Sequence, residues 1–155
     1  MSKLAIKYLQ SHGINDIRLT NYNYDKGQKV AKEHGCIYSK IQYIGNLISS
    51  SDIIITSTSS STPVIGKGLI ESCLKTSKNL PVVIIDLGVP RDVEPEIAKL
   101  DNVYLYSIDD LSRRGSAALC GGLAVASFVV LTPAGHRIQT FSRMRRHCPH
   151  LRSLL

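Results

Sequence analysis

Hydrophobic and polar positions follow two different periods along the first 111 residues of this 155-residue chain. Apolar residues spaced three and four apart predict helices, and short apolar runs rich in β-branched residues predict strands that are buried on both faces. Because the two kinds of segment alternate, we expect an α/β fold with a doubly wound, parallel, Rossmann-like sheet. The predicted helices are 3–12, 25–34, 41–49 and 67–77, and the predicted strands are 16–20, 36–39, 52–56, 82–86 and 103–106.

This alternation stops at about residue 112, and the charge balance changes at the same place. Residues 1–111 hold all 12 acidic residues and 12 of the 19 basic ones, whereas residues 112–155 hold seven arginines and neither a lysine nor an acid. The stretch 117–131 is apolar, with a Gly-Gly pair and no polar face. We therefore expect an α/β unit over 1–111, followed by an irregular, arginine-rich tail over 112–155.

Several interpretations fit the sequence of the tail. Its arginines fit a nucleic-acid arm or a membrane-surface segment, but it has no lysine and few aromatic residues for stacking on bases. The abrupt change of residue usage favours a sequence of different origin or reading frame. An ordinary terminal extension is the remaining alternative.

The sequence does not fit a membrane-spanning protein, a secreted protein, or a protein held together by metal ions or disulfides. No apolar run reaches the roughly 18 residues that span a bilayer. The amphipathic N-terminus lacks the core of a signal peptide. The four cysteines stand far apart without a CxxC pair, so neither a metal site nor a disulfide framework is expected. We expect a cytoplasmic protein with no membrane association.

The stretch 82–111 contains the best candidate for a ligand site. A predicted buried strand ends at Asp86. Gly88, Pro90 and Pro95 then keep the chain out of regular structure until the next predicted strand. Two acidic residues, Asp109 and Asp110, come after that strand. In an open α/β sheet, ligands bind at the carboxyl ends of the strands. The alternative is an acidic helix cap followed by a solvated loop.

Two further loops follow predicted strands. Residues 57–68 (STSSSTPVIGKG) offer small hydroxyl side chains beside which a ligand can approach the backbone, although a flexible serine-rich loop has the same composition. Asn21, Tyr22 and Asn23 follow the strand 16–20 without an acid. An acid at that place favours NAD, so its absence favours NADP, but asparagines are also common turn residues. The chain has no GxGxxG turn.

Three segments together resemble the glutamyl-tRNA reductase family. They are IIDLGVPRDVEPEIAKLDNVYLYSIDDL, STSSSTPVIGKGLIE, and LAIKYLQSHG with LTNYNYDKGQKVA after it. The resemblance covers residues 1–111. It implies an NADPH-dependent oxidoreductase that reduces glutamyl-tRNA to glutamate-1-semialdehyde in tetrapyrrole (porphyrin and heme) biosynthesis.

The resemblance also implies a set of NADPH-binding positions. Two residues match the end of the family's Gly-rich turn, three match the loop at the adenosine ribose, two lie in a loop near the cofactor, and four match the loop beside the nicotinamide. In that order, the positions are Met1 and Ser2; Asn21, Tyr22 and Asn23; Thr58 and Ser59; and Gly88, Val89, Pro90 and Arg91. Of these, Tyr22 takes the place of the arginine expected at the 2′-phosphate.

The resemblance does not extend to the family's other domains. The catalytic cysteine lies in an N-terminal domain that binds glutamyl-tRNA, and a long helix builds the homodimer; neither matches this sequence. Cys36 and Cys73 are expected to be core or helix-face residues, and no catalytic residue is predicted. We thus expect a fragment, truncated at both ends and inactive alone. The alternatives are a non-catalytic NADP-binding module and a shikimate-dehydrogenase-like oxidoreductase, although no catalytic Lys/Asp pair is recognisable.

The first strand of this fold lies between the second and fourth strands, and the resemblance begins after it. Without that strand, two inner strand edges lack ladder partners, and each buried unpaired backbone group costs about 1–3 kcal/mol. We expect a marginal or aggregation-prone chain unless the apolar run 123–131 fills the gap.

Overall fold

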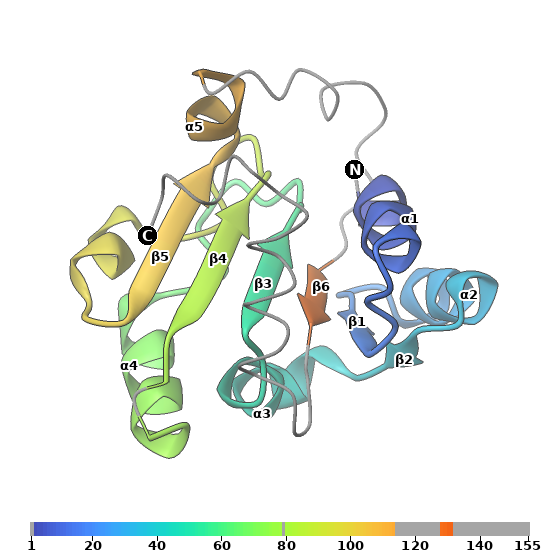
Figure 1. Cartoon of the computed structure of the whole chain (residues 1–155), viewed down its shortest axis with the longest axis horizontal. Coiled ribbons are helices and arrows are strands. Elements are labelled where there is room, and N and C mark those ends of the chain that lie inside the picture. Colours follow the sequence, from blue (N-terminus) through green and yellow to red (C-terminus); the bar gives the residue numbers. More distant parts are fainter. Residues whose placement is uncertain (1, 79, 114–127, 132–155) are drawn as a thin grey trace.

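A mixed sheet forms the centre of the computed structural model, which describes residues 2–78, 80–113 and 128–131 (Figure 1). In these residues the sheet has six strands in the order β2-β1-β6-β3-β4-β5. The strands are β1 (Ile17–Thr20), β2 (Ile37–Tyr38), β3 (Ile53–Thr56), β4 (Val82–Asp86), β5 (Val103–Ser107) and β6 (Phe128–Leu131). The helices are α1 (Ser2–Ser11), α2 (Tyr24–His34), η1 (Ile41–Tyr43), α3 (Ile44–Ser49), α4 (Lys67–Thr76), η2 (Pro95–Lys99) and α5 (Ile108–Arg113).

Helices cover both faces of this sheet. The helices α1 and α2 pack on one face, and α3, α4 and η2 pack on the other. Along β3 the side chains alternate between the two cores: Ile53 and Ile55 belong to the first, and Ile54 belongs to the second. A strand with a core on each side has no polar face, which explains its continuous apolar run.

The predicted α/β fold and its parallel strands are confirmed. The strand β1 pairs in parallel with β2, and β3, β4 and β5 pair in parallel with one another. Every helix and strand predicted before residue 111 is present, with ends that differ by at most one residue. The single helix predicted over 41–49 divides into η1 and α3.

The position between β1 and β3 is filled by β6, which runs antiparallel to both neighbours. Part of the tail expected to be irregular is therefore a strand. It lies inside the apolar run 123–131, and it supplies the ladder partners that the two inner edges would otherwise lack. Most of the arginine-rich tail lies outside the described residues.

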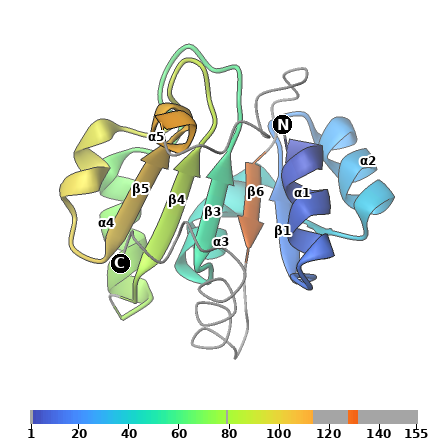
Figure 2. The same ribbon diagram turned by 45° about the horizontal axis from the view of Figure 1, so that its top comes forward.

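The carboxyl ends of β1, β3, β4 and β5 meet at one edge of the sheet, because these strands all run the same way (Figure 2). The N-terminal end of α1 lies at this edge too. We call it the carboxyl edge. None of the helices in the described part of the chain is long and apolar enough to cross a membrane.

Candidate nucleotide-binding site

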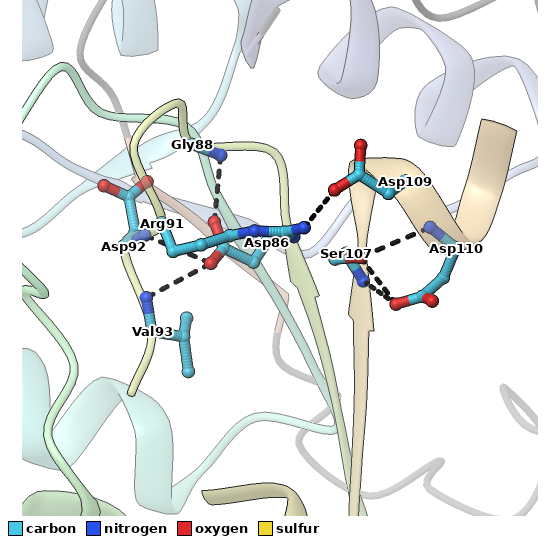
Figure 3. Close-up of polar contacts among 8 residues, drawn as sticks. All are labelled: Asp86, Gly88, Arg91, Asp92, Val93, Ser107, Asp109 and Asp110. Atoms are coloured by element: carbon cyan, nitrogen blue, oxygen red, sulfur yellow. Dashed lines mark hydrogen bonds and ion pairs between the residues drawn. The ribbon is translucent and has the colours of Figure 1, made fainter. Parts of the chain in front are cut away.

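The loop after β4 is organised by the carboxylate of Asp86. Its Oδ1 accepts hydrogen bonds from the backbone N–H of Gly88 at 2.9 Å and from the hydroxyl of Thr56 at 3.2 Å. Its Oδ2 accepts the backbone N–H groups of Asp92 and Val93 at 3.1 and 3.2 Å (Figure 3). Asp86 is buried, so it is neither a helix cap nor part of a solvated loop. It folds the loop back over the end of β4.

A second buried carboxylate, that of Asp92, joins this loop to the loop after β3. It accepts the backbone N–H of Thr58 at 2.7 Å and also the Thr58 hydroxyl. Burial raises the pKa of Asp92 above its usual range, the bonds from Thr58 oppose that shift, and the charge of Asp86 adds to it. The two loops at the carboxyl edge therefore form one connected unit.

Gly88 lies where this unit is most tightly packed. A Cβ at this position would lie 2.5 Å from the Asp92 carboxyl carbon, so a side chain there displaces the loop. The next peptide bond, Val89–Pro90, is cis, and the Val89 side chain is 75% exposed. The predicted nicotinamide loop thus has a tight base and an exposed apolar tip.

The acidic pair after β5 does not form a single ligand cluster. Asp109 pairs with Arg91 from the neighbouring loop. Asp110 accepts the backbone N–H of Ser107 at 2.9 Å, and its own N–H donates to the Ser107 hydroxyl at 3.2 Å (Figure 3). This reciprocal bonding is a capping box at the start of α5. Arg91 is therefore held by a carboxylate at the carboxyl edge.

The loop after β1 uses its two asparagines for turn and cap geometry. The side-chain oxygen of Asn21 accepts the N–H of Asn23 at 2.8 Å, and that of Asn23 accepts the N–H of Lys26 at 2.9 Å at the start of α2. Between them, Tyr22 is 61% exposed. The turn interpretation of the asparagines is therefore correct, and Tyr22 is the large exposed group of this loop.

Of the two residues matched to the Gly-rich turn, Met1 lies outside the described residues, and Ser2 begins α1. In the described part of the chain, the central strand β6 does not run into α1. It instead begins at the carboxyl edge, where Phe128 pairs with Thr20. The strand–turn–helix unit that cradles a pyrophosphate is thus not formed by the described residues.

The two described cysteines are packing residues, as predicted. Cys73 is buried in the core beneath α4, and Cys36 is half-buried beside the other core. Burial raises the pKa of both thiols, which disfavours the reactive thiolate.

Asp92 is the residue that the sequence-based selection of site residues missed. The spacing of the two aspartates could have indicated it. Asp92 follows Asp86 by six residues, across a loop that contains Gly88 and Pro90, and an aspartate at that distance can hold the loop closed.

The groups left at the carboxyl edge fit a nucleotide better than a metal. Ser59 is exposed next to Thr58, and the Thr20 hydroxyl is buried with no hydrogen-bond partner among the described residues. Hydroxyl and main-chain groups around an apolar tip suit sugar and amide groups. The three loops predicted to bind cofactor thus share one edge, although most of their polar side chains also bond within the protein.

Comparison with known proteins is consistent with this arrangement. Residues 1–114 match the family described as Shikimate / quinate 5-dehydrogenase. The chain is 41% identical over 113 residues to the glutamyl-tRNA reductase of Ruthia magnifica subsp. Calyptogena magnifica, and 40% identical to that of Vesicomyosocius okutanii subsp. Calyptogena okutanii (strain HA). Each match covers 73% of this chain and 27% of the relative, so the chain spans about a quarter of the length of these relatives.

Among solved structures, the chain resembles glutamyl-tRNA reductase from Methanopyrus kandleri with a TM-score of 0.68 and 21% sequence identity. This match covers 99% of the present chain and 32% of the other, and at that identity it supports the fold alone. The resemblance to glutamyl-tRNA reductases is confirmed by the sequence matches. The chain therefore belongs to the Shikimate / quinate 5-dehydrogenase family, which covers the nucleotide-binding domain of glutamyl-tRNA reductases.

Proposed function

We propose that this chain is the nucleotide-binding portion of a glutamyl-tRNA reductase and that it binds NADPH at the carboxyl edge. The observation that carries the proposal is the convergence of three loops at that edge, in a chain 40–41% identical to two enzymes of that name. Within the complete enzyme, such a unit serves the reduction of glutamyl-tRNA to glutamate-1-semialdehyde. The catalytic nucleophile and the tRNA contacts are assigned to other parts of that enzyme, so this portion alone is inactive.

Each loop has a separate role in this proposal. Residues 57–60, fixed by the bond between Thr58 and Asp92, present Ser59 to the cofactor. The loop 87–91 lies beside the nicotinamide, and its exposed tip at Val89 and Pro90 excludes water from that face. When bound, the reduced nicotinamide supplies a hydride. Residues 21–23 lie at the adenosine ribose.

A pair of bulky substitutions at opposite ends of β3 tests the location of the site. Ser59 follows this strand and Ser50 precedes it, and both are exposed. We expect Ser59→Trp to weaken NADPH binding at least about tenfold in a calorimetric titration, because the indole fills the space proposed for the cofactor. Ser50→Trp, the matched control, leaves the affinity unchanged. Equal affinities for both variants and the wild type contradict the proposed location.

A shikimate-dehydrogenase-like oxidoreductase is the second candidate, because the matching family carries that name. The curated relatives at about 40% identity are named glutamyl-tRNA reductase, which favours the first candidate. Incubation of the chain with NADP and shikimate separates the two. Formation of NADPH supports the dehydrogenase, and its absence in protein that binds NADPH supports the reductase portion.

A further inference from the structure

The sheet depends on one short segment at its centre. With four register pairs to β1 and three to β3, β6 joins the β2-β1 half of the sheet to the β3-β4-β5 half (Figure 1). No ladder connects β1 directly to β3. We call the space between these two strands the central slot.

The central slot requires an occupant. The strands on either side of the slot lie in the middle of the sheet, and their residues Ile17, Leu19 and Ile54 are fully buried in the cores on its two faces. If the slot were empty, the facing backbone groups of both strands would lose their partners inside the protein, at about 1–3 kcal/mol for each buried group. Two open inner edges are also a template for pairing with any extended chain.

The requirements for that occupant are general. The segment present, FVVL, has four apolar residues without a charge, a glycine or a proline, which is a composition of high strand propensity. It enters antiparallel to two strands that run parallel to each other. Binding therefore needs only an extended backbone and apolar side chains, as in other cases of recognition by strand addition.

β6 is covalently joined to the chain whose sheet it completes. Residues 114–127 separate the end of α5 from the start of β6, and 14 residues can span up to about 46–50 Å. Covalent connection of a ligand to its site raises the effective concentration of that ligand at the site. The link therefore favours the strand of the same chain over a free one.

We propose that the central slot is a strand-acceptor site that binds an extended apolar segment, and that β6 is its exchangeable occupant. The ligand to which we commit is a second strand with the sequence of Phe128–Leu131 that enters in the same antiparallel register. In the intact chain β6 competes with this ligand, so the site becomes available when β6 is prevented from pairing.

The first test uses the full-length chain with Val130→Pro, which removes a ladder N–H from the middle of β6. The probe is a fluorescent peptide that spans residues 126–133 (ASFVVLTP), and binding is followed by anisotropy. We expect the variant to bind the peptide at least about tenfold more tightly than the wild type does. The matched variant Val130→Thr, which keeps both the N–H and the β-branch, behaves as the wild type. Equal binding by folded Val130→Pro and wild-type proteins overturns the proposal.

A second test applies if Val130→Pro does not fold. Arg18 pairs with Val130 in the ladder, so the chain with Arg18→Cys is mixed with a large molar excess of peptides activated as aryl disulfides at position 130 or 129. β6 still competes in this chain, but exchange of β6 out of the slot gives the excess peptide access, and the disulfide then retains each peptide that enters. The protein thiolate displaces the aryl thiolate and forms one new disulfide. Adjacent strand positions point to opposite faces, so we expect the peptide activated at 130 to label that thiol at least about tenfold faster, as located by mass spectrometry. Equal labelling by the two peptides, or no labelling, overturns the proposal.

Discussion

At the scale of the residue, the carboxyl edge is held together by two buried carboxylates, those of Asp86 and Asp92. Asp86 accepts three backbone N–H groups, and Asp92 accepts the backbone N–H and the hydroxyl of Thr58. Such bonds replace the water that these buried groups would otherwise require. The polar residues of this edge therefore act first as a scaffold, and Ser59 and Val89 next to them are exposed.

The buried Asp92 carboxyl makes the stability of this scaffold depend on pH. Its pKa is raised by burial, so the native state holds the proton more tightly than the unfolded chain does. Ionisation then lowers the free energy of unfolding as pH rises from about 4 through the raised pKa. We expect the free energy of unfolding of the wild type, minus that of Asp92→Asn, to decrease with pH over this window.

Urea denaturation at a series of pH values from about 4 to 7 measures this difference. The control is Asp109→Asn, in which an exposed carboxylate is changed in the same way. If the free energy of unfolding of the wild type, minus that of Asp92→Asn, increases with pH, the pKa of Asp92 is not raised in the native state.

Tyr22 occupies the position at which we propose that the 2′-phosphate of NADPH binds. It is 61% exposed, between two asparagines that already bond to backbone groups. An arginine there can make charge-assisted bonds to a phosphate, each worth about 1.5–3 kcal/mol. We expect Tyr22→Arg to raise the affinity for NADPH about tenfold and to leave the affinity for NADH unchanged.

Calorimetric titration with both nucleotides checks this expectation. Tyr8→Arg, which adds the same charge at an exposed tyrosine of α1, controls for general attraction of the cofactor phosphates. An equal gain for both nucleotides, or an equal gain in both variants, would show that Tyr22 is not at the 2′-phosphate.

At the scale of the element, the helices differ in how closely they approach the rest of the fold. In α2, a Cβ at Gly27 would lie 2.4 Å from Tyr38 Cε2 and 2.8 Å from Asn21 Cβ. In α4, a Cβ at Gly68 would meet nothing within 4 Å. The first glycine is thus required by packing, whereas the second only weakens its helix.

The two Gly→Ala substitutions should consequently have opposite effects on stability. Gly68→Ala gains the helix propensity of alanine, about 0.5–1 kcal/mol in the free energy of unfolding. Gly27→Ala makes the same gain but overpacks the contact with Tyr38, at about 1–3 kcal/mol, so we expect a net loss. Thermal melts of the two variants and of the wild type show whether each substitution raises or lowers the stability. A stabilised Gly27→Ala protein would contradict the packing described for α2.

Most of the elements could be predicted from the sequence, because their signals are local. The run 53–55 predicts a strand, and Gly35, which adopts φ +66° at the end of α2, marks a helix end. The division of 41–49 into η1 and α3 was not predicted, because both helix types place apolar residues on one face. The partners of Asp86 and Asp92 were missed because hydrogen bonds across a loop depend on how that loop folds.

At the scale of the whole molecule, β6 is the feature that the sequence predicted least well. Its apolar run was recognisable, and filling of the central gap was one of two expected outcomes. Its direction and register were not predictable, because they result from pairing between residues 128–131 and two strands far away in the sequence. That pairing is determined by which strands can form a ladder with one another, rather than by a local sequence signal.

At the carboxyl edge, loops from distant parts of the chain combine into one proposed nucleotide site. Hydrogen exchange with and without saturating NADPH tests it most directly, because the method reports protection amide by amide. We predict slower exchange at the backbone amides of residues 21–23, 57–60 and 87–91, and unchanged exchange in η2 and the C-terminal half of α4. Protection confined to the opposite edge, or no protection at saturating NADPH, would contradict the claim.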